Sequence, residues 1–190
     1  ISPCHFDTVE YRMSAMAQTP YNVKRTLGIF ALFYLIIVGG PTVYRASQSR
    51  SGKDYASYHY AAHAVWSKTS PYRGANLDVH AKRERTRRKV HPFFYPPPAV
   101  LFFLWSPLFS LKTSFVIFAV MSNLCWLASL WLIRKMVGAS WILLGIVGVL
   151  YSPASGSVNM GQVNLLVLFL LLLAYHRSNG LLISLPAMIK

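Results

Sequence analysis

Long uncharged apolar runs constrain the fold of this chain more than any other feature of its sequence. Three of them, at 27–43, 92–111 and 113–133, approach or reach the roughly 20 residues that a helix needs to cross a bilayer. Hydrophobic residues make up 54% of the chain and charged residues only 13%, a balance that excludes an ordinary soluble domain. Because backbone polar groups in lipid are satisfied only in helices or closed barrels, we expect an all-α, polytopic membrane protein.

The second half of the chain contains shorter apolar runs. Those at 137–151 and 162–175 are about 15 residues long, so they either borrow polar flanking residues or reach only part of the way across a bilayer. Another run begins at 181 and stops at Lys190, which is too short to cross a hydrocarbon core of about 30 Å. We therefore expect 26–190 to be the N-terminal part of a larger transmembrane domain that is truncated here.

The basic residues give conflicting signals about orientation. Lys24 and Arg25 precede the first run, so the positive-inside rule favours a cytoplasmic segment 1–25, which we also expect to be disordered. The polar loop at 44–91 is more basic still, but the rule weakens in long loops, and we expect this loop to be extracytoplasmic, in a cell (plasma) membrane. The formal charge of +14 would attract the chain to the anionic head groups of membrane lipids, which is the interpretation that we favour. The other interpretation, nucleic-acid binding, would require a soluble basic fold.

A helix is predicted within this polar loop, starting close to Asp54. The segment Ser51–Asp54 has the spacing of a capping box, with Ser51 as the N-cap, and the helix would continue to about Trp66. One face of it would be largely aromatic, carrying Tyr55, Tyr58, His59, Ala62 and Trp66. Since Tyr and Trp prefer the boundary between water and lipid, we expect this helix to lie in the membrane interface.

Carboxylates are scarce, and this scarcity limits where acid/base chemistry can occur. From Met16 to Lys190 only three are present, Asp54, Asp78 and Glu84, and all lie in the polar loop. Any reaction that uses a carboxylate therefore takes place there. The three acids are scattered and form no recognisable set of metal ligands, so we expect neither a metal site nor a cofactor.

Two further segments contain helix-breaking residues. Three successive prolines follow Tyr95, and without backbone N–H donors they would form a rigid, extended entrance to the apolar run at 92–111. Small residues, glycine and proline in 152–164 are expected to interrupt the helix at membrane depth, where irregular backbone is tolerated only in a protein interior or a wet cavity. Gln162 and Asn164 are therefore candidates for binding a polar ligand. The alternative is that they cap the next helix or join two helices.

The order of these motifs resembles glycosyltransferase family 87 over about 26–190. The motifs that carry the resemblance are Asp54-Tyr55 with Tyr58 and Tyr60-Ala61-Ala62, Pro71-Tyr72, Tyr95-Pro96-Pro97, Gly161-Gln162-Val163-Asn164, and a helix of small residues that ends in Lys190. Members of the family are polyprenyl-phosphate-sugar-dependent, mannosyltransferase-like membrane enzymes of the GT-C fold. The resemblance implies that the chain is the N-terminal half of such an enzyme, that the first loop faces away from the cytoplasm, and that Asp54 is the catalytic base. The basic insert at 82–89 departs from the pattern.

The expected reaction follows from that resemblance. A hexose, by resemblance mannose, would pass from a polyprenyl-phosphate sugar to a glycolipid or glycan acceptor, with inversion at the anomeric carbon. A lipid phosphate is already a good leaving group, so a single carboxylate acting as general base is sufficient. Besides Asp54 as the catalytic residue, the candidate substrate-binding residues are Tyr58, His59, Tyr95, Gln162, Asn164 and Lys190.

Two other classes of protein are compatible with the sequence. The first is a transporter fragment that binds its substrate at the broken helix near Gly161. Against it, the predicted spans contain no charged residue, whereas ion-coupled transport usually requires one. The second is an inactive, truncated membrane protein, which would share all of these features except activity.

Overall fold

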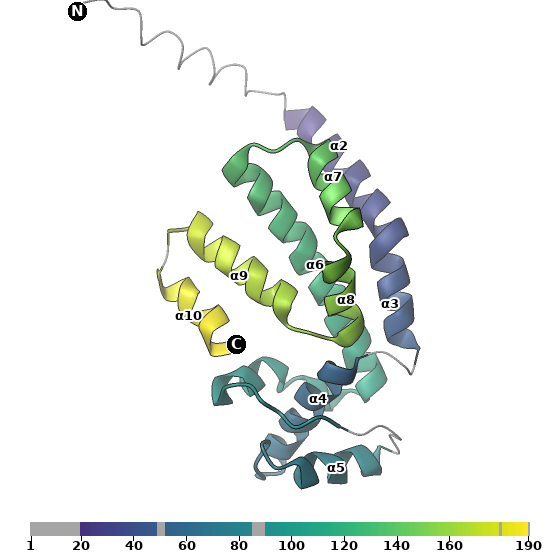
Figure 1. Cartoon of the computed structure of the whole chain (residues 1–190), viewed down its shortest axis with the longest axis vertical. Helices are drawn as coiled ribbons and strands as arrows, with labels where there is room; N and C mark the ends of the chain where they lie inside the picture. Colours follow the sequence, from purple (N-terminus) through teal and green to yellow (C-terminus); the bar gives the residue numbers. More distant parts are fainter. Residues whose placement is uncertain (1–19, 49–51, 85–89, 179, 190) are drawn as a thin grey trace, which may run out of the picture.

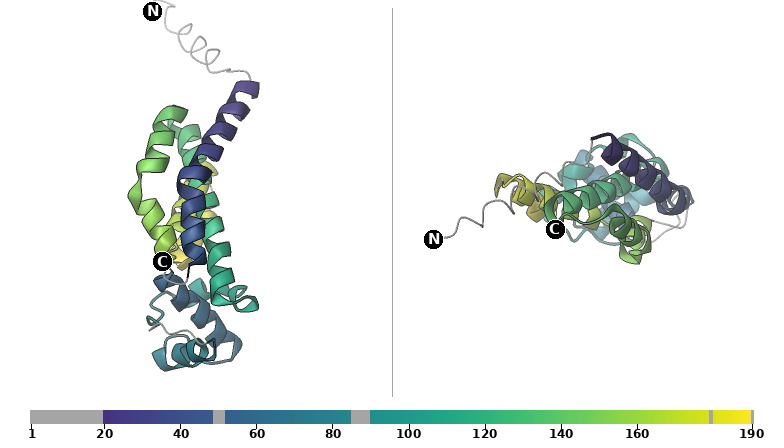
Figure 2. Two further views of the ribbon diagram at one scale, coloured as in Figure 1. Left: turned by 90° about the vertical axis from the view of Figure 1, so that its right-hand side faces the viewer. Right: turned by 90° about the horizontal axis from the view of Figure 1, so that it is seen from above.

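The computed structural model describes residues 20–48, 52–84, 90–178 and 180–189, and the regular structure within these ranges is entirely helical. Most of the helices run side by side along the longest axis of the molecule (Figure 1). Two others, α4 (Lys53–Trp66) and α5 (Gly74–Arg83), lie beyond one end of this bundle, as a second view also shows (Figure 2). The predicted class, a helical membrane protein, is confirmed.

The first long helix is continuous but changes its pitch in the middle. It consists of α2 (Pro20–Tyr34), the π-helical turn η1 (Leu35–Gly39) and α3 (Gly40–Ser47). The N–H of Gly40 donates to the carbonyl of Leu35, five residues back, just before Pro41, which has no N–H to donate. Residues 20–25 are thus helical, which differs from the prediction that 1–25 is disordered. Residues 1–19 lie outside the described residues.

The second long helix, α6 (Leu111–Val137), coincides with the apolar run expected at 113–133. The Ser110 side chain caps its start by accepting a hydrogen bond from the Thr113 N–H, and its C-cap, Gly138, is left-handed. Buried Asn123 fastens α6 to the first helix: it accepts a hydrogen bond from the Tyr34 hydroxyl at 2.7 Å and donates one to Thr42 Oγ1 at 3.1 Å. Such satisfied polar contacts join helices in an apolar surrounding.

The next helices form a bent pair followed by a short break. α7 (Trp141–Leu150) and α8 (Ser152–Met160) meet at an angle of 47°, an arrangement typical of a broken span or a re-entrant loop. The prediction that 152–164 is irregular is therefore wrong for 152–160, where Pro153 occupies the first turn of α8 and costs no hydrogen bond. The real break lies at 161–163, before α9 (Asn164–His176) and α10 (Gly180–Ile189).

The apolar run at 92–111 does not form the continuous membrane helix that we expected. Its helical parts are two short 3-10 segments, η2 (Pro97–Phe103) and η3 (Ser106–Leu108), which pack against α4. Prolines at 96–98 and 107 remove the N–H donors that a regular helix would need. By length and composition, two described helices can cross a membrane, or three if α7 and α8 are one span.

Helix α4 is buried on nearly every side, which corrects the prediction of an amphipathic helix with one aromatic face. Nine of its 14 residues are buried, among them four small alanines that let neighbouring elements approach closely. Trp66, at its end, remains 53% exposed. The N-cap position is taken by Gly52 and not by Ser51, which lies outside the described residues. The segment after Pro71 forms helix α5, which begins at Gly74.

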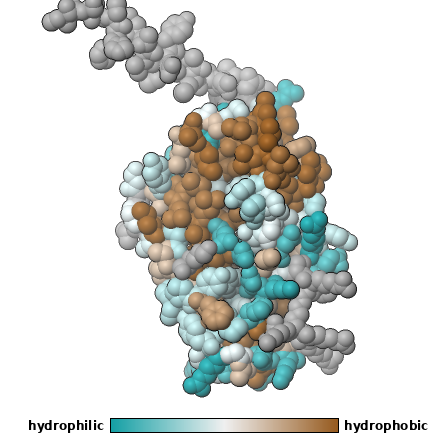
Figure 3. Space-filling model, in the orientation of Figure 1, coloured by the Kyte–Doolittle hydropathy of each residue, from teal (hydrophilic) through white to brown (hydrophobic). Residues whose placement is uncertain are grey.

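The surface divides into two parts that match this arrangement. On the face drawn in Figure 3, apolar surface is concentrated on the bundle, whereas the end formed by α4 and α5 is mainly hydrophilic. Exposed large hydrophobic residues are numerous on the bundle helices, for example Ile29, Ile36, Ile142 and Leu150. A membrane protein exposes such residues to lipid, so the bundle is the part that fits a bilayer.

The packing of the end of α8 against α4 can be tested at Gly161. This residue ends α8 in a left-handed conformation (φ +76°), and a Cβ there would lie 2.5 Å from the Cβ of Tyr55. We expect Gly161→Ala to destabilise the protein by more than about 1–2 kcal/mol, the cost of the left-handed conformation alone. Gly156→Ala, within α8, meets nothing within 4 Å and should leave the thermal midpoint unchanged or raise it. Thermal unfolding in detergent measures both, and equal midpoints would contradict this packing.

Candidate functional site

Asp54 and Gln162, which are 108 residues apart in sequence, meet where the start of α4 touches the break between α8 and α9. Gln162 Nε2 donates a hydrogen bond of 2.9 Å to Asp54 Oδ2. A backbone contact reinforces this approach, since the Gly52 N–H donates to the Asn159 carbonyl at 2.9 Å. Asp54 and Gln162 are both half-buried, so a ligand can reach them.

Two glycines make this contact possible. Gly52 and Gly161 both have positive φ, +82° and +76°, and both pack against the ring of Phe115 on α6. A Cβ at Gly52 would lie 2.9 Å from that ring, and one at Gly161 would overlap Tyr55. Residues with a Cβ rarely adopt this conformation, and their side chains would not fit here. The start of α4 and the end of α8 can therefore approach each other this closely only because both positions are glycine.

The amide groups form a short chain that orients Gln162. Asn164 Nδ2 donates to Gln162 Oε1 at 2.9 Å, and Gln162 Nε2 in turn donates to Asp54. Because the amide oxygen of Gln162 is occupied by Asn164, its nitrogen must face the carboxylate. In the described part of the chain we find no hydrogen bond to the second oxygen of Asp54, Oδ1, which is therefore available to a substrate hydroxyl.

Tyr58 lies beside this carboxylate, and Tyr95 lies beside Tyr58. The rings of Tyr58 and Tyr95 are 5.0 Å apart, and Tyr58 also stacks on Phe103 at 4.5 Å. Burial raises the pKa of Tyr58 above its usual range, and the adjacent Tyr95 and the charge of Asp54 raise this pKa further. The Tyr58 side chain therefore stays neutral. The backbone of Tyr95 is held by the Tyr72 hydroxyl, which donates to its carbonyl at 3.0 Å.

The Tyr58 hydroxyl is buried and has no hydrogen bond of good geometry to a described residue. Tyr95, Asp54 and the backbone of Val163 nevertheless lie close enough to shift its pKa.

Five of the seven predicted site residues come together here: Asp54, Tyr58, Tyr95, Gln162 and Asn164. Lys190 lies outside the described residues. His59 belongs to a different cluster, because its side chain is fully buried between α5 and α6 and both ring nitrogens have other partners.

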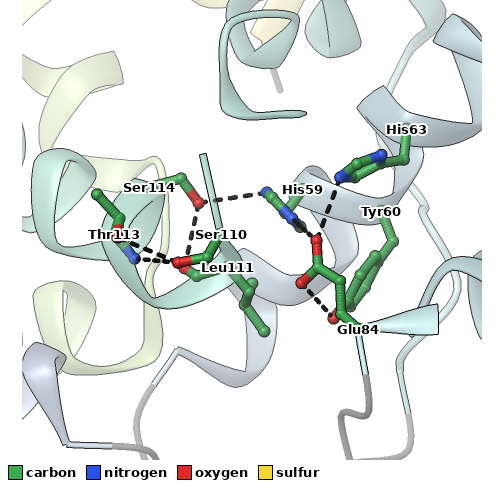
Figure 4. Close-up of polar contacts among 8 residues, drawn as sticks. All are labelled: His59, Tyr60, His63, Glu84, Ser110, Leu111, Thr113 and Ser114. Carbon is green, nitrogen blue, oxygen red and sulfur yellow. Dashed lines mark hydrogen bonds and ion pairs between the residues drawn. The ribbon is translucent and has the colours of Figure 1, made fainter. Parts of the chain in front are cut away.

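That second cluster surrounds Glu84, just after α5 (Figure 4). Glu84 Oε1 lies 3.2 Å from His59 Nε2 and 3.4 Å from His63 Nε2, and Glu84 Oε2 accepts a hydrogen bond from the Tyr60 hydroxyl at 3.3 Å. On the far side of the His59 ring, Nδ1 is 3.2 Å from Ser114 Oγ of α6. The cluster thus ties the end of α5 to α4, and α4 to α6.

Burial affects both ends of the His59–Glu84 pair. It lowers the pKa of His59, an effect that Glu84 partly opposes. For Glu84, burial by itself would raise the pKa, but the hydrogen bonds and charges of His59 and His63 outweigh burial and hold the pKa below its usual range. Sequence reasoning did not find this cluster, although the spacing of His59 and His63, four residues apart in a helix, was a signal that could have pointed to it.

Comparison with protein families connects this geometry to a known group. The sequence model of glycosyltransferase family 87 matches residues 93–190. The chain belongs to glycosyltransferase family 87. Comparison with curated proteins and with solved structures finds no significant match. The predicted family is thereby confirmed, and the protein is a membrane glycosyltransferase, as family membership indicates.

The matched region contains three of the five residues that meet at the candidate site. Tyr95, Gln162 and Asn164 lie inside it, whereas Asp54 and Tyr58 precede it. The hydrogen bond between Gln162 and Asp54 therefore connects the carboxylate of the polar loop to the region that matches the family model.

Proposed function

We propose that this protein transfers a hexose from a polyprenyl-phosphate sugar to a glycolipid or glycan acceptor, with Asp54 as the general base. Mannose is the sugar expected from the family resemblance, and a GT-C-like arrangement of helices is the expected fold. The observation that carries the proposal is the hydrogen bond from Gln162 to Asp54, which joins a half-exposed carboxylate to the segment that matches the family model.

The other described carboxylates fit this role less well. Glu84 is held by two histidines and by Tyr60, so its oxygens already have partners. Asp78 lies on the exposed side of α5, on the polar end of the molecule. Asp54 alone among the described acids contacts the segment that follows α8. It also lies in the first turn of α4, where the helix dipole stabilises a negative charge.

The reaction is a direct displacement. The acceptor oxygen attacks the anomeric carbon while Asp54 takes the proton of that hydroxyl, and the bond from the anomeric carbon to the phosphate oxygen breaks. The electron pair of this bond leaves with the polyprenyl phosphate, so no acid has to protonate the leaving group. Gln162 keeps one carboxylate oxygen in place and leaves the other, Oδ1, free to accept the proton.

Neighbouring side chains suit the two parts of the donor. The amide chain from Asn164 reaches Asp54, and Tyr95 packs on Tyr58, which adjoins Asp54. A sugar ring bound here can pack on an aromatic face and exchange hydrogen bonds with amides. The departing phosphate needs positive charge, and Lys53, which adjoins Asp54 and is exposed, can supply it. His59 is not available for this purpose, because Glu84 and Ser114 engage its ring.

Asp54→Asn tests the assignment of the base. The change keeps the shape of the side chain but removes its basicity, and a lost general base typically costs about 100-fold or more in rate. We expect sugar transfer from a polyprenyl-phosphate donor, measured in membranes that contain the protein, to fall by at least that factor. Asp78→Asn, on exposed α5, is the matched control and should retain activity. Full activity of the Asp54→Asn protein would show that another group is the base.

We also propose that α4 and α5 face away from the cytoplasm, in the plasma membrane. Ser70 is suited to test this, since it is exposed in the turn between these helices. In a protein that carries Ser70→Cys and lacks its other cysteines, an impermeant maleimide should label intact cells from outside. A cysteine placed at the opposite end of the bundle, at Ala139, should react only after the membrane is opened. The reverse pattern would contradict the proposed orientation.

A further inference from the structure

The cluster of His59, His63 and Glu84 takes no part in the chemistry proposed for Asp54. His59 and His63 lie one turn apart on α4, and Glu84 reaches them from the residue after α5. One ligand atom from each of the three residues can be chosen so that all lie within 4.8 Å of one another. We propose that these three side chains bind a divalent transition-metal ion of the zinc type, and that the ion fastens α5 to the helix that carries Asp54.

The separations of the ligand atoms support this proposal. In a tetrahedral zinc site with bonds of 2.0–2.1 Å, two ligand atoms lie about 3.3 Å apart. Glu84 Oε1 is 3.2 Å from His59 Nε2 and 3.4 Å from His63 Nε2, so two of the three separations already have this value. The third separation, between the two imidazole nitrogens, is at most 4.8 Å and has to shorten when the ion binds. The His63 side chain is 25% exposed, so it has room to move.

Outer contacts hold two of the ligands in the orientation that a metal requires. Ser114 Oγ donates to the Leu111 carbonyl at 3.1 Å, so it can accept from the Nδ1–H of His59 and leave Nε2 unprotonated toward the ion. The Tyr60 hydroxyl donates to Glu84 Oε2 and leaves Oε1 for the ion. In protein metal sites, the ligating side chains characteristically make such a hydrogen bond to a residue outside the coordination sphere.

The donor set indicates which metals fit. Two imidazoles and one carboxylate suit zinc and related transition metals, whereas magnesium and calcium prefer oxygen ligands. Three protein ligands leave one position for water. The imidazole of His80, on α5, stacks on His63 with ring centroids 5.4 Å apart and adds a further packing contact between the two helices.

Metal binding to the tag-free protein in detergent tests the proposal. After treatment with a chelator and reloading with zinc, elemental analysis should find one zinc per chain, and zinc should raise the thermal midpoint. Cobalt should give the visible absorption bands of a tetrahedral site with nitrogen and oxygen ligands. A wild-type protein that holds no stoichiometric zinc and shows no such bands would overturn the proposal.

Variants show whether these residues are the ligands. His63→Gln and Glu84→Gln preserve polarity and size, and each should weaken zinc binding at least tenfold while the protein still elutes as a single species. His176→Gln, at the exposed end of α9, should bind zinc as the wild type does. If the double variant His63→Gln/Glu84→Gln binds zinc as tightly as the wild type, the ion is held elsewhere and the proposal fails. These readouts do not depend on sugar transfer, so they are independent of the role of Asp54.

Discussion

The close approach of Gly52 and Gly161 is the constraint on which the rest of the site depends. Both glycines adopt left-handed conformations against Phe115, and the start of α4 thereby comes into contact with the end of α8. Only at this distance can Gln162 donate its hydrogen bond to Asp54. A carboxylate from the polar loop and an amide from the bundle are thus held in one place by a backbone contact that tolerates no side chain.

The burial of α4 gives this contact its rigidity. Alanines along the helix allow η2, α5 and α6 to pack against it, and Tyr58 stacks on Phe103 of η2. At the other end of the packed region, the cluster around Glu84 links α5 to α4, and Ser114 connects the same cluster to α6. Asp54 therefore belongs to a firmly held helix, and such pre-organisation favours a group that must meet a substrate hydroxyl in a defined geometry.

The sequence was sufficient to predict the helical membrane class and the family, because the length of apolar runs and the order of motifs can be read without knowing tertiary contacts. The predictions failed where the structure is determined by contacts between segments that are far apart in the sequence. The aromatic pattern of α4 indicated an interfacial helix, but the small residues on its other sides bury it. Hydropathy indicated a span at 92–111, whereas prolines at 96–98 prevent a regular helix. The partners of His59 remained hidden, since Glu84 follows it by 25 residues.

The central claim is that Gln162 acts on Asp54 directly, and a double-mutant cycle tests it best. Asp54→Ala, Gln162→Ala and the double variant are compared with the wild type in thermal unfolding and, where activity is measurable, in sugar transfer. Contacting residues should show a coupling free energy of at least about 0.5 kcal/mol, whereas the control pair Asp78→Ala with Gln162→Ala should be additive. Additive effects of Asp54→Ala and Gln162→Ala would contradict the account.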